Sequence, residues 1–97
     1  MKHAGQDILK RLAPLLRELR KRSGLREKSV GVFYLKSKAF LHFHDDPAGI
    51  FADVKLDLTA YSRFRVTTIK EQLSLLRRID KCLATRVSQT DLSNKFF

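Results

Sequence analysis

Cysteine and long apolar runs are what this sequence has least of. Cys82 is the only cysteine among the 97 residues, so the chain cannot form an intramolecular disulfide. Lys or Arg interrupts every apolar run before it reaches the ~18 residues that a membrane-spanning helix needs. The N-terminus also has no apolar stretch of the signal-peptide type. The sequence therefore predicts a soluble protein of the reducing cytoplasm.

The common catalytic and phosphate-binding motifs are absent as well. The chain has no glycine-rich phosphate loop, no nucleophile elbow and no His-Glu-x-x-His pair. Cys82 lies in a predicted helix without an activating neighbour in the sequence, and buried packing is the ordinary role of such a cysteine. The absence of these motifs favours a protein that is not an enzyme, and no cofactor is predicted.

Negative charge is scarce, and its distribution is uneven. Ten acidic residues stand against 20 Lys and Arg, which gives a formal net charge of +10. Residues 1–28 hold nine bases and three acids, residues 29–58 three bases and four acids, and residues 59–97 eight bases and three acids. Such basic ends favour a polyanion or an anionic membrane surface as partner, although a merely solvated surface has the same composition.

The clearest pattern lies in residues 30–56, VGVFYLKSKAFLHFHDDPAGIFADVKL. Apolar and polar residues alternate there as they do in β-strands, and the turn sequences KSK and DDPAG divide the segment into three strands. If His42 pairs with Asp53, one face collects Ala39, Leu41, Phe43, Ile50, Ala52, Val54 and Leu56. The other face then carries Phe40, His42, His44, Phe51, Asp53 and Lys55. A slip by one residue would mix the two sets, so the pattern fixes the register.

The two turns are specified unequally. DDPAG opens with Asp and Pro, and Gly49 can supply a positive φ. LKSKA contains no glycine, which favours a loop longer than a primed two-residue turn. If that turn is nevertheless short, Val30, Val32 and Tyr34 join the apolar face.

Helices are predicted on both sides of the strands. Pro14 should kink the first helix or begin a new one, and Gly24 should follow its end; its apolar stripe is Ile8, Leu9, Leu12, Leu15, Leu16 and Leu19. A short extended piece at residues 63–66 precedes the second helix, which starts at a capping box of Thr68 and Glu71 and ends near Ala84. Its expected buried stripe is Ile69, Leu73, Leu76, Ile79 and Leu83.

These elements predict an α+β fold in the order α-β-β-β-α. We expect a two-layer sandwich in which N- and C-terminal helices cover one face of an antiparallel three-stranded meander. Residues 1–84 form a single domain, and residues 85–97 form a weakly ordered C-terminal tail.

Two histidines on one strand form the first candidate site. His42 and His44 lie two residues apart, so both imidazoles fall on one face, with Asp53 opposite. Two imidazoles and a carboxylate could bind a metal ion or perform general acid–base catalysis. The simpler reading is a cross-strand ion pair between histidine and aspartate, and we predict no metal from this pattern alone.

The rest of that sheet face forms the second candidate. Rings flanked by cations are typical of sheets that bind single-stranded nucleic acid, but the same surface could close against a second copy or a protein partner, or be covered by a loop. The residues of this sheet-face interaction site are Lys38, Phe40, His42, His44, Phe51, Asp53 and Lys55.

The segment GVFYLKSKAFLHFH also carries a resemblance. Its extended run, turn, returning lysine and second apolar strand resemble the central hairpin of MmcQ/YjbR-type bacterial proteins and, more distantly, of the TfoX N-terminal type. The whole chain is similar to a group of small bacterial proteins. The MmcQ/YjbR resemblance implies a frataxin-like α+β fold and suggests DNA binding, with Lys38 as the matching hairpin lysine.

The favoured hypothesis is a small, basic, non-enzymatic module that binds nucleic acid or another polyanion through its helices. The cations expected to do so are Arg17, Arg20, Lys21, Arg22, Arg77, Arg78 and Lys81. The first alternative is a protein-interaction or homodimerisation domain that uses the sheet face. The second is a metal-binding or hydrolytic site at His42, His44 and Asp53.

Overall fold

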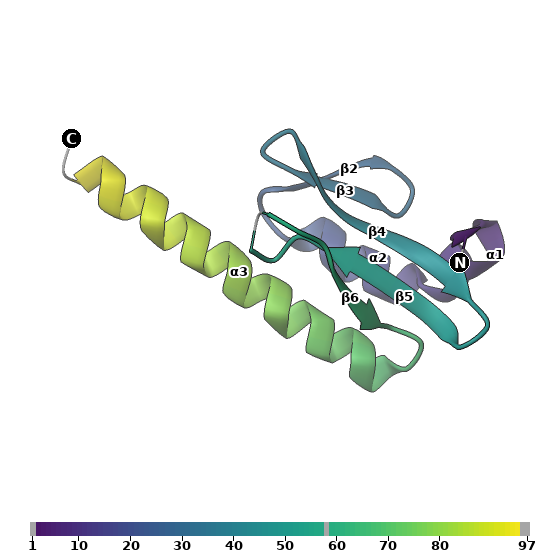
Figure 1. Ribbon diagram of the computed structural model, residues 1–97. Coiled ribbons are helices and arrows are strands. Elements are labelled where there is room, and N and C mark those ends of the chain that lie inside the picture. Colours follow the sequence, from purple (N-terminus) through teal and green to yellow (C-terminus); the bar gives the residue numbers. More distant parts are fainter. Residues whose placement is uncertain (1, 58, 96–97) are drawn as a thin grey trace.

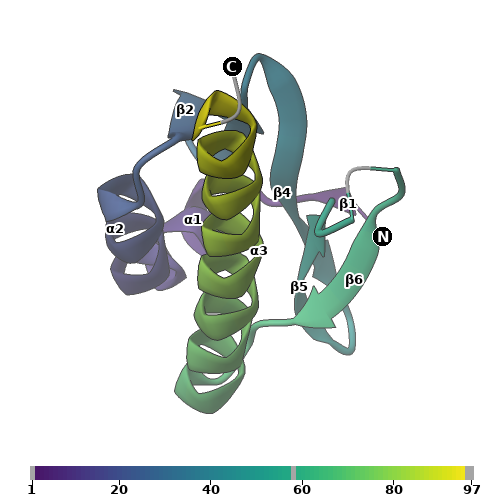
Figure 2. The same ribbon diagram turned by 90° about the vertical axis from the view of Figure 1, so that its left-hand side faces the viewer.

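An antiparallel sheet is the centre of the molecule, and the helices lie on one of its faces (Figures 1 and 2). The computed structural model describes the backbone of residues 2–57 and 59–95, and the side chains of residues 4–57 and 59–85. The elements in chain order are β1 (Lys2–His3), α1 (Gln6–Arg11), α2 (Ala13–Lys21), β2 (Leu25–Ser29), β3 (Val32–Leu35), β4 (Lys38–Asp46), β5 (Gly49–Val54), β6 (Ser62–Arg65) and α3 (Ile69–Lys95). The fold is α+β, as predicted.

The expected three-stranded meander and the order α-β-β-β-α are wrong. The meander is the middle of a longer sheet with the order β2-β3-β4-β5-β6, and β1 pairs with β4 away from this path. β2 has the sequence LREKS, in which charged residues hide the strand pattern. Charged side chains are common on edge strands, where they oppose edge-to-edge association. β6, at the other edge, corresponds to the short extended piece predicted at residues 63–66.

The predicted register of the central strands is confirmed. β4 and β5 pair with His42 opposite Asp53 and Leu41 opposite Val54. Leu41 and Val54 are 1% and 0% exposed, so they face the core, whereas His42 lies on the other face. The apolar residues of these strands pack under the helices, which removes them from water and stabilises the sandwich.

The turn between β3 and β4 differs from its prediction. Leu35 pairs with Lys38, so the turn has only two residues, Lys36 and Ser37, with φ of 51° and 69°. Both values lie in the left-handed region, which is the geometry of a primed turn. A glycine-free sequence therefore makes the turn that usually contains glycine.

A β-bulge next to this turn explains which side chains are buried. Phe33 pairs with Leu41 while Tyr34 pairs with Ala39, so Phe40 is an extra residue in β4. Because a bulge re-aims the strand, Phe40 is 1% exposed and joins the core. Its predicted place on the histidine face is wrong. Phe33 and Leu35 take the core positions that the short-turn alternative gave to Val30, Val32 and Tyr34, and Val30 is 60% exposed.

The N-terminal helical segment divides at Leu12, whose φ of −90° and ψ of 3° separate α1 from α2. Pro14 lies in the first turn of α2, where a missing N–H costs nothing. The proline therefore marks a new helix, one of the two expected outcomes. Gly24, with φ of +94°, follows the end of α2 and leads into β2.

The helix α3 begins as predicted but packs differently. The Thr68 N–H donates to Glu71 Oε1 at 2.9 Å and the Glu71 N–H to Thr68 Oγ1 at 3.2 Å, which forms the capping box. Ile69 and Leu73 are 75% and 49% exposed, so their assignment to the buried stripe is wrong. Gln72 takes the inward position in the first turns, because its amide donates to the Val66 carbonyl oxygen.

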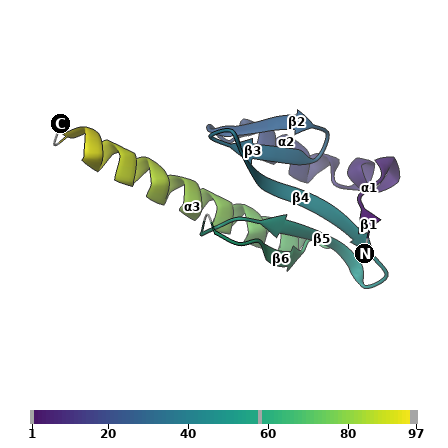
Figure 3. The ribbon, with the colours of Figure 1, turned by 45° about the horizontal axis from the view of Figure 1, so that its top comes forward.

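The inward face of α3 consists of Leu75, Leu76 and Ile79, with Cys82 and Leu83 half-buried. The helix continues to Lys95 rather than ending near Ala84, and its C-terminal half projects beyond the sheet (Figures 1 and 3). The weakly ordered tail at residues 85–97 stays a prediction, and residues 96–97 lie outside the described part. None of the described helices combines the length and the hydropathy that a transmembrane span requires.

Candidate functional site

Three neighbouring strands bring polar side chains together on the open face of the sheet. β4 carries His42 and His44, β5 carries Asp53, and β6 carries Arg63. The register places His42, Asp53 and Arg63 in one row across the strands. We call His42, His44, Asp53 and Arg63 the histidine cluster. Its first three members were predicted to lie together, and the structure confirms this.

Asp53 is the centre of the histidine cluster and is only 6% exposed. Arg63 forms a bidentate pair with this carboxylate: its Nε donates to Oδ1 at 2.7 Å and its Nη2 donates to Oδ2 at 3.0 Å. These hydrogen bonds lower the pKa of the Asp53 carboxyl, against the opposite effect of burial, and the positive charge of Arg63 adds to the lowering. Asp53 is therefore a buried carboxylate that stays ionised.

The two imidazoles converge on one oxygen of that carboxylate. His44 Nε2 lies 2.8 Å from Asp53 Oδ2, and His42 Nε2 lies 3.4 Å from the same atom. The imidazole rings contact edge-to-face at 4.7 Å between centroids, and Tyr61 packs on His42 at 4.9 Å. The Nζ of Lys55 lies 4.8 Å from the centre of the Tyr61 ring. These contacts hold the imidazoles in place.

The remaining members of the predicted sheet-face site do not form one platform. Phe40 belongs to the core, Lys38 is exposed at the start of β4, and Phe51 and Lys55 are half-buried on β5 and beyond it. The side chains that remain are dominated by polar groups and not by exposed rings. Stacking of successive bases needs accessible ring faces. Phe40, the main residue predicted for this role, is buried and cannot provide one.

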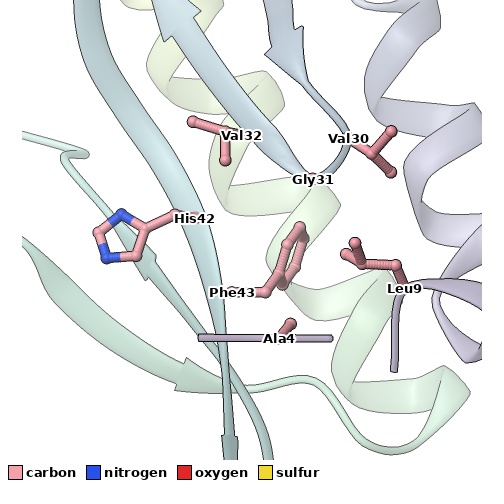
Figure 4. Close-up of a pocket in the computed structure, with 7 residues that line it drawn as sticks. All are labelled: Ala4, Leu9, Val30, Gly31, Val32, His42 and Phe43. Carbon is pink, nitrogen blue, oxygen red and sulfur yellow. The ribbon is translucent and has the colours of Figure 1, made fainter. Parts of the chain in front are cut away.

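A small hollow lies beside β4, and His42 and Phe43 of this strand are among its lining residues. It has a volume of about 50 Å³ and its lining includes Leu9, Val30, Gly31 and Phe43. Figure 4 shows the His42 ring pointing away from the side chains of Leu9, Val30 and Phe43. Pockets for small molecules usually enclose several hundred Å³, so this hollow is too small for such a ligand.

The predicted basic residues lie on the helical layer. α2 and α3 lie next to each other on one side of the sheet (Figure 2). Arg22, the C-cap residue of α2, donates to both carboxylate oxygens of Asp80 in α3, at 2.9 and 3.0 Å. The hydrogen bonds to Asp80 raise the pKa of Arg22, and the hydrogen bond to Glu18 adds to this effect. The solvent-facing sides of α2 and α3 therefore lie next to each other.

Three of the seven predicted cations have acidic partners within the chain. Arg20 pairs with Glu27 of β2, Lys21 with Glu18, and Arg22 with Glu18 and Asp80. Arg78 lies over the Phe64 ring at 5.0 Å. Among the described side chains, Arg17, Arg77 and Lys81 form no ion pair and are exposed.

Helical geometry directs these free cations outward. At 100° per residue, Arg77 and Lys81 lie on the side of α3 opposite Ile79. Lys70, which is not among the seven predicted cations, lies on the same side. Arg17 lies on the outer side of α2 in the same way, opposite Leu12 and Leu19. We call Arg17, Lys70, Arg77 and Lys81 the basic helical face. The seven-residue spacing from Lys70 to Arg77 was the signal that could have identified Lys70.

Arg63 was also missed. It could have been found only if Ser62–Arg65 had been recognised as a strand paired with β5, because its partner lies 10 residues away in the sequence.

Comparison of the chain with models of protein families, with curated proteins and with solved structures found no match.

Proposed function

We propose that this protein is a small non-enzymatic module that binds nucleic acid through its basic helical face. The observation that carries the proposal is the arrangement of α2 and α3, which are tied together by Arg22 and Asp80 and direct unpaired cations outward. Phosphates that are neutralised by such cations release their counterions, which drives association without any specific base contact.

The acids of α2 and α3 whose side chains the structure describes all have basic partners. Glu18 is engaged by Lys21 and Arg22, Asp80 by Arg22 and Glu71 by Arg65. The free cations of α2 and α3 therefore meet a phosphate backbone without a competing unpaired carboxylate among these residues. A partner that carries a regular row of negative charges suits such a surface.

The composition of the two helices indicates which part of a nucleic acid they contact. Neither α2 nor α3 contains an aromatic residue, so the basic helical face offers no rings on which bases can stack. Contacts from Lys and Arg to phosphates position a protein without reading sequence. The resemblance of the β3–β4 region to MmcQ/YjbR-type proteins points toward DNA in the same way. We therefore propose duplex DNA, bound without strong sequence preference.

A salt titration tests the proposal. Fluorescence anisotropy of a labelled DNA duplex should give a micromolar Kd at moderate salt. Log affinity should fall with log salt at a slope of about −3.6, because each neutralised phosphate of B-DNA contributes about −0.9 and the basic helical face offers four cations. A slope near zero, or no binding at moderate salt, would contradict the proposal. Equal affinity for anionic lipid vesicles would assign the surface to membranes instead.

A further inference from the structure

We propose that the histidine cluster binds a divalent transition-metal ion such as Zn²⁺, in exchange for Arg63. The ligands would be Nε2 of His42, Nε2 of His44 and a carboxylate oxygen of Asp53. The neighbouring residues Leu41 and Val54 face the core under the helices, so His42 and Asp53 lie on the opposite face of the sheet. Figure 2 shows the helices on one face only. The metal proposal therefore does not depend on the proposed function.

The donor atoms are already close to the spacing that a metal requires. One ligand atom from each of His42, His44 and Asp53 lies within 4.8 Å of the others. The two distances to Asp53 Oδ2 are 2.8 and 3.4 Å. Tetrahedral Zn²⁺ with bonds of about 2.0–2.1 Å holds its donors about 3.3 Å apart. Small rotations of the imidazoles and the carboxylate therefore suffice to form the site.

The chemistry of the donors agrees with this class of ion. Imidazole nitrogen with one carboxylate oxygen suits Zn²⁺, Ni²⁺ and Cu²⁺ better than Mg²⁺ or Ca²⁺. Three protein ligands would leave a fourth position for water. The side chains of His42 and His44 are 23% and 13% exposed, so an ion can reach them from the solvent while the sheet holds them in place.

Arg63 is the competitor in this arrangement. It neutralises Asp53 through two hydrogen bonds, and a cation of charge +2 at the same carboxylate would repel it. Its side chain is 49% exposed and belongs to the edge strand β6. The guanidinium can therefore turn into water without breaking the sheet, and its departure returns both carboxylate oxygens to the metal.

A purely structural network predicts something different. Arg63 alone satisfies the charge of Asp53, and two imidazoles at the same oxygen add nitrogen donors beyond what neutralisation requires. If the network serves only stability, loss of Arg63 should weaken the fold and should create no affinity for metal. If the network is a metal site, loss of Arg63 should strengthen metal binding.

Isothermal titration with ZnCl₂ of the tag-free full chain separates the two cases. We expect one Zn²⁺ per chain at micromolar Kd, a loss of about 100-fold or more in His44→Gln and in His42→Gln, and a gain of about 10-fold in Arg63→Met. Arg65→Met is the matched control, because Arg65 on the same strand pairs with Glu71 and not with Asp53. It should leave the Zn²⁺ affinity unchanged.

The histidine signals in NMR spectra give a second readout. Zn²⁺ should shift the Nε2 resonances of His42 and His44, and the dispersion of the amide signals reports whether each variant is folded. If His44→Gln does not fold, the more exposed His42→Gln provides the same test. Absence of Zn²⁺ binding to the wild type, binding that survives His42→Gln, or Arg63→Met binding no tighter than Arg65→Met would each overturn the proposal.

Discussion

Asp53 shows how one residue can be costly to bury and still stabilise the fold. Removing a carboxylate from water is unfavourable unless it is paired and hydrogen-bonded, and Arg63, His44 and His42 all surround Asp53. Loss of the carboxylate would leave the row across β4, β5 and β6 without its centre. Asp53→Asn should therefore lower the free energy of unfolding by about 1–3 kcal/mol at neutral pH.

The pH dependence of stability follows from the direction of the pKa shift. Arg63 lowers the pKa of Asp53 in the folded state, against burial, whereas the unfolded chain titrates near the ordinary value of about 3.9. The stabilisation from Asp53 is therefore fully present above the unfolded pKa and is lost as the pH falls through the folded pKa. Urea unfolding from pH 6 to pH 2 should show a steeper loss of stability for the wild type than for Asp53→Asn.

Asp45→Asn is the control for this comparison, because Asp45 forms no ion pair with the described side chains. It should retain the acid dependence of the wild type. If Asp53→Asn retained that dependence too, the carboxylate would not contribute in the way described.

The pairing of His42 with Asp53 could be predicted from the sequence because the alternation of apolar residues permits only one register. Arg63 was not assigned to the site, because the short extended piece predicted at residues 63–66 gave no signal for its pairing with β5. Phe40 was assigned to the wrong face because a bulge leaves no signal in an alternating sequence. A single extra residue in a strand moves a side chain to the opposite face of the sheet, and the alternation of apolar and polar residues around it stays the same.

At the scale of elements, the two residues that connect β3 to β4 adopt a left-handed conformation that is unfavourable for residues other than glycine. Lys36 and Ser37 both have positive φ, which costs non-glycine residues about 1 kcal/mol each. Asn-Gly is the preferred sequence for this turn. The double variant Lys36→Asn, Ser37→Gly should therefore raise the free energy of unfolding by about 1 kcal/mol, as measured by urea unfolding.

Lys38→Asn is the matched change for the turn, because Lys38 is exposed and lies outside the left-handed region. It should leave stability nearly unchanged. A double turn variant that is no more stable than this control would show that the turn is not strained.

The elements that the sequence predicted correctly are those with a strong periodic signal. The three central strands, the new helix at Pro14 and the capping box of α3 all have local sequence causes. β2 and β6 are edge strands with charged residues on them, so their pairing depends on neighbours that the sequence does not name. The buried stripe of α3 was displaced for a similar reason, since the choice between Leu73 and Leu75 depends on how the helix lies against α2 and β6.

The whole molecule has two chemically different sides. One side carries α2 and α3 with the basic helical face, and the other is the open face of the sheet with the histidine cluster (Figure 2). The sequence indicated most residues of both sets, without Lys70 and Arg63, but not their placement. Contacts such as the one from Arg22 to Asp80 join residues that are 58 positions apart. Net charge alone could not show that the free cations of both helices share one side.

Two charge-matched triple variants test directly whether DNA binds to this side. Arg17→Gln, Arg77→Gln, Lys81→Gln removes three charges from the basic helical face. Arg26→Gln, Lys36→Gln, Lys38→Gln removes three exposed charges from the β2–β3–β4 hairpins. Both variants reduce the net charge from +10 by three. Any difference between them therefore reports the place of the charges and not their number.

The decisive measurement is the affinity of both variants for the same DNA duplex at 0.1 M salt, with the salt slope of each. The helical variant should bind about 100-fold more weakly or worse, with a slope reduced by about 2.7 units, because three phosphate contacts at about 0.9 each are lost. The hairpin variant should stay within a few-fold of the wild type and keep its slope. Equal losses in both variants, or the larger loss in the hairpin variant, would contradict binding through the helices.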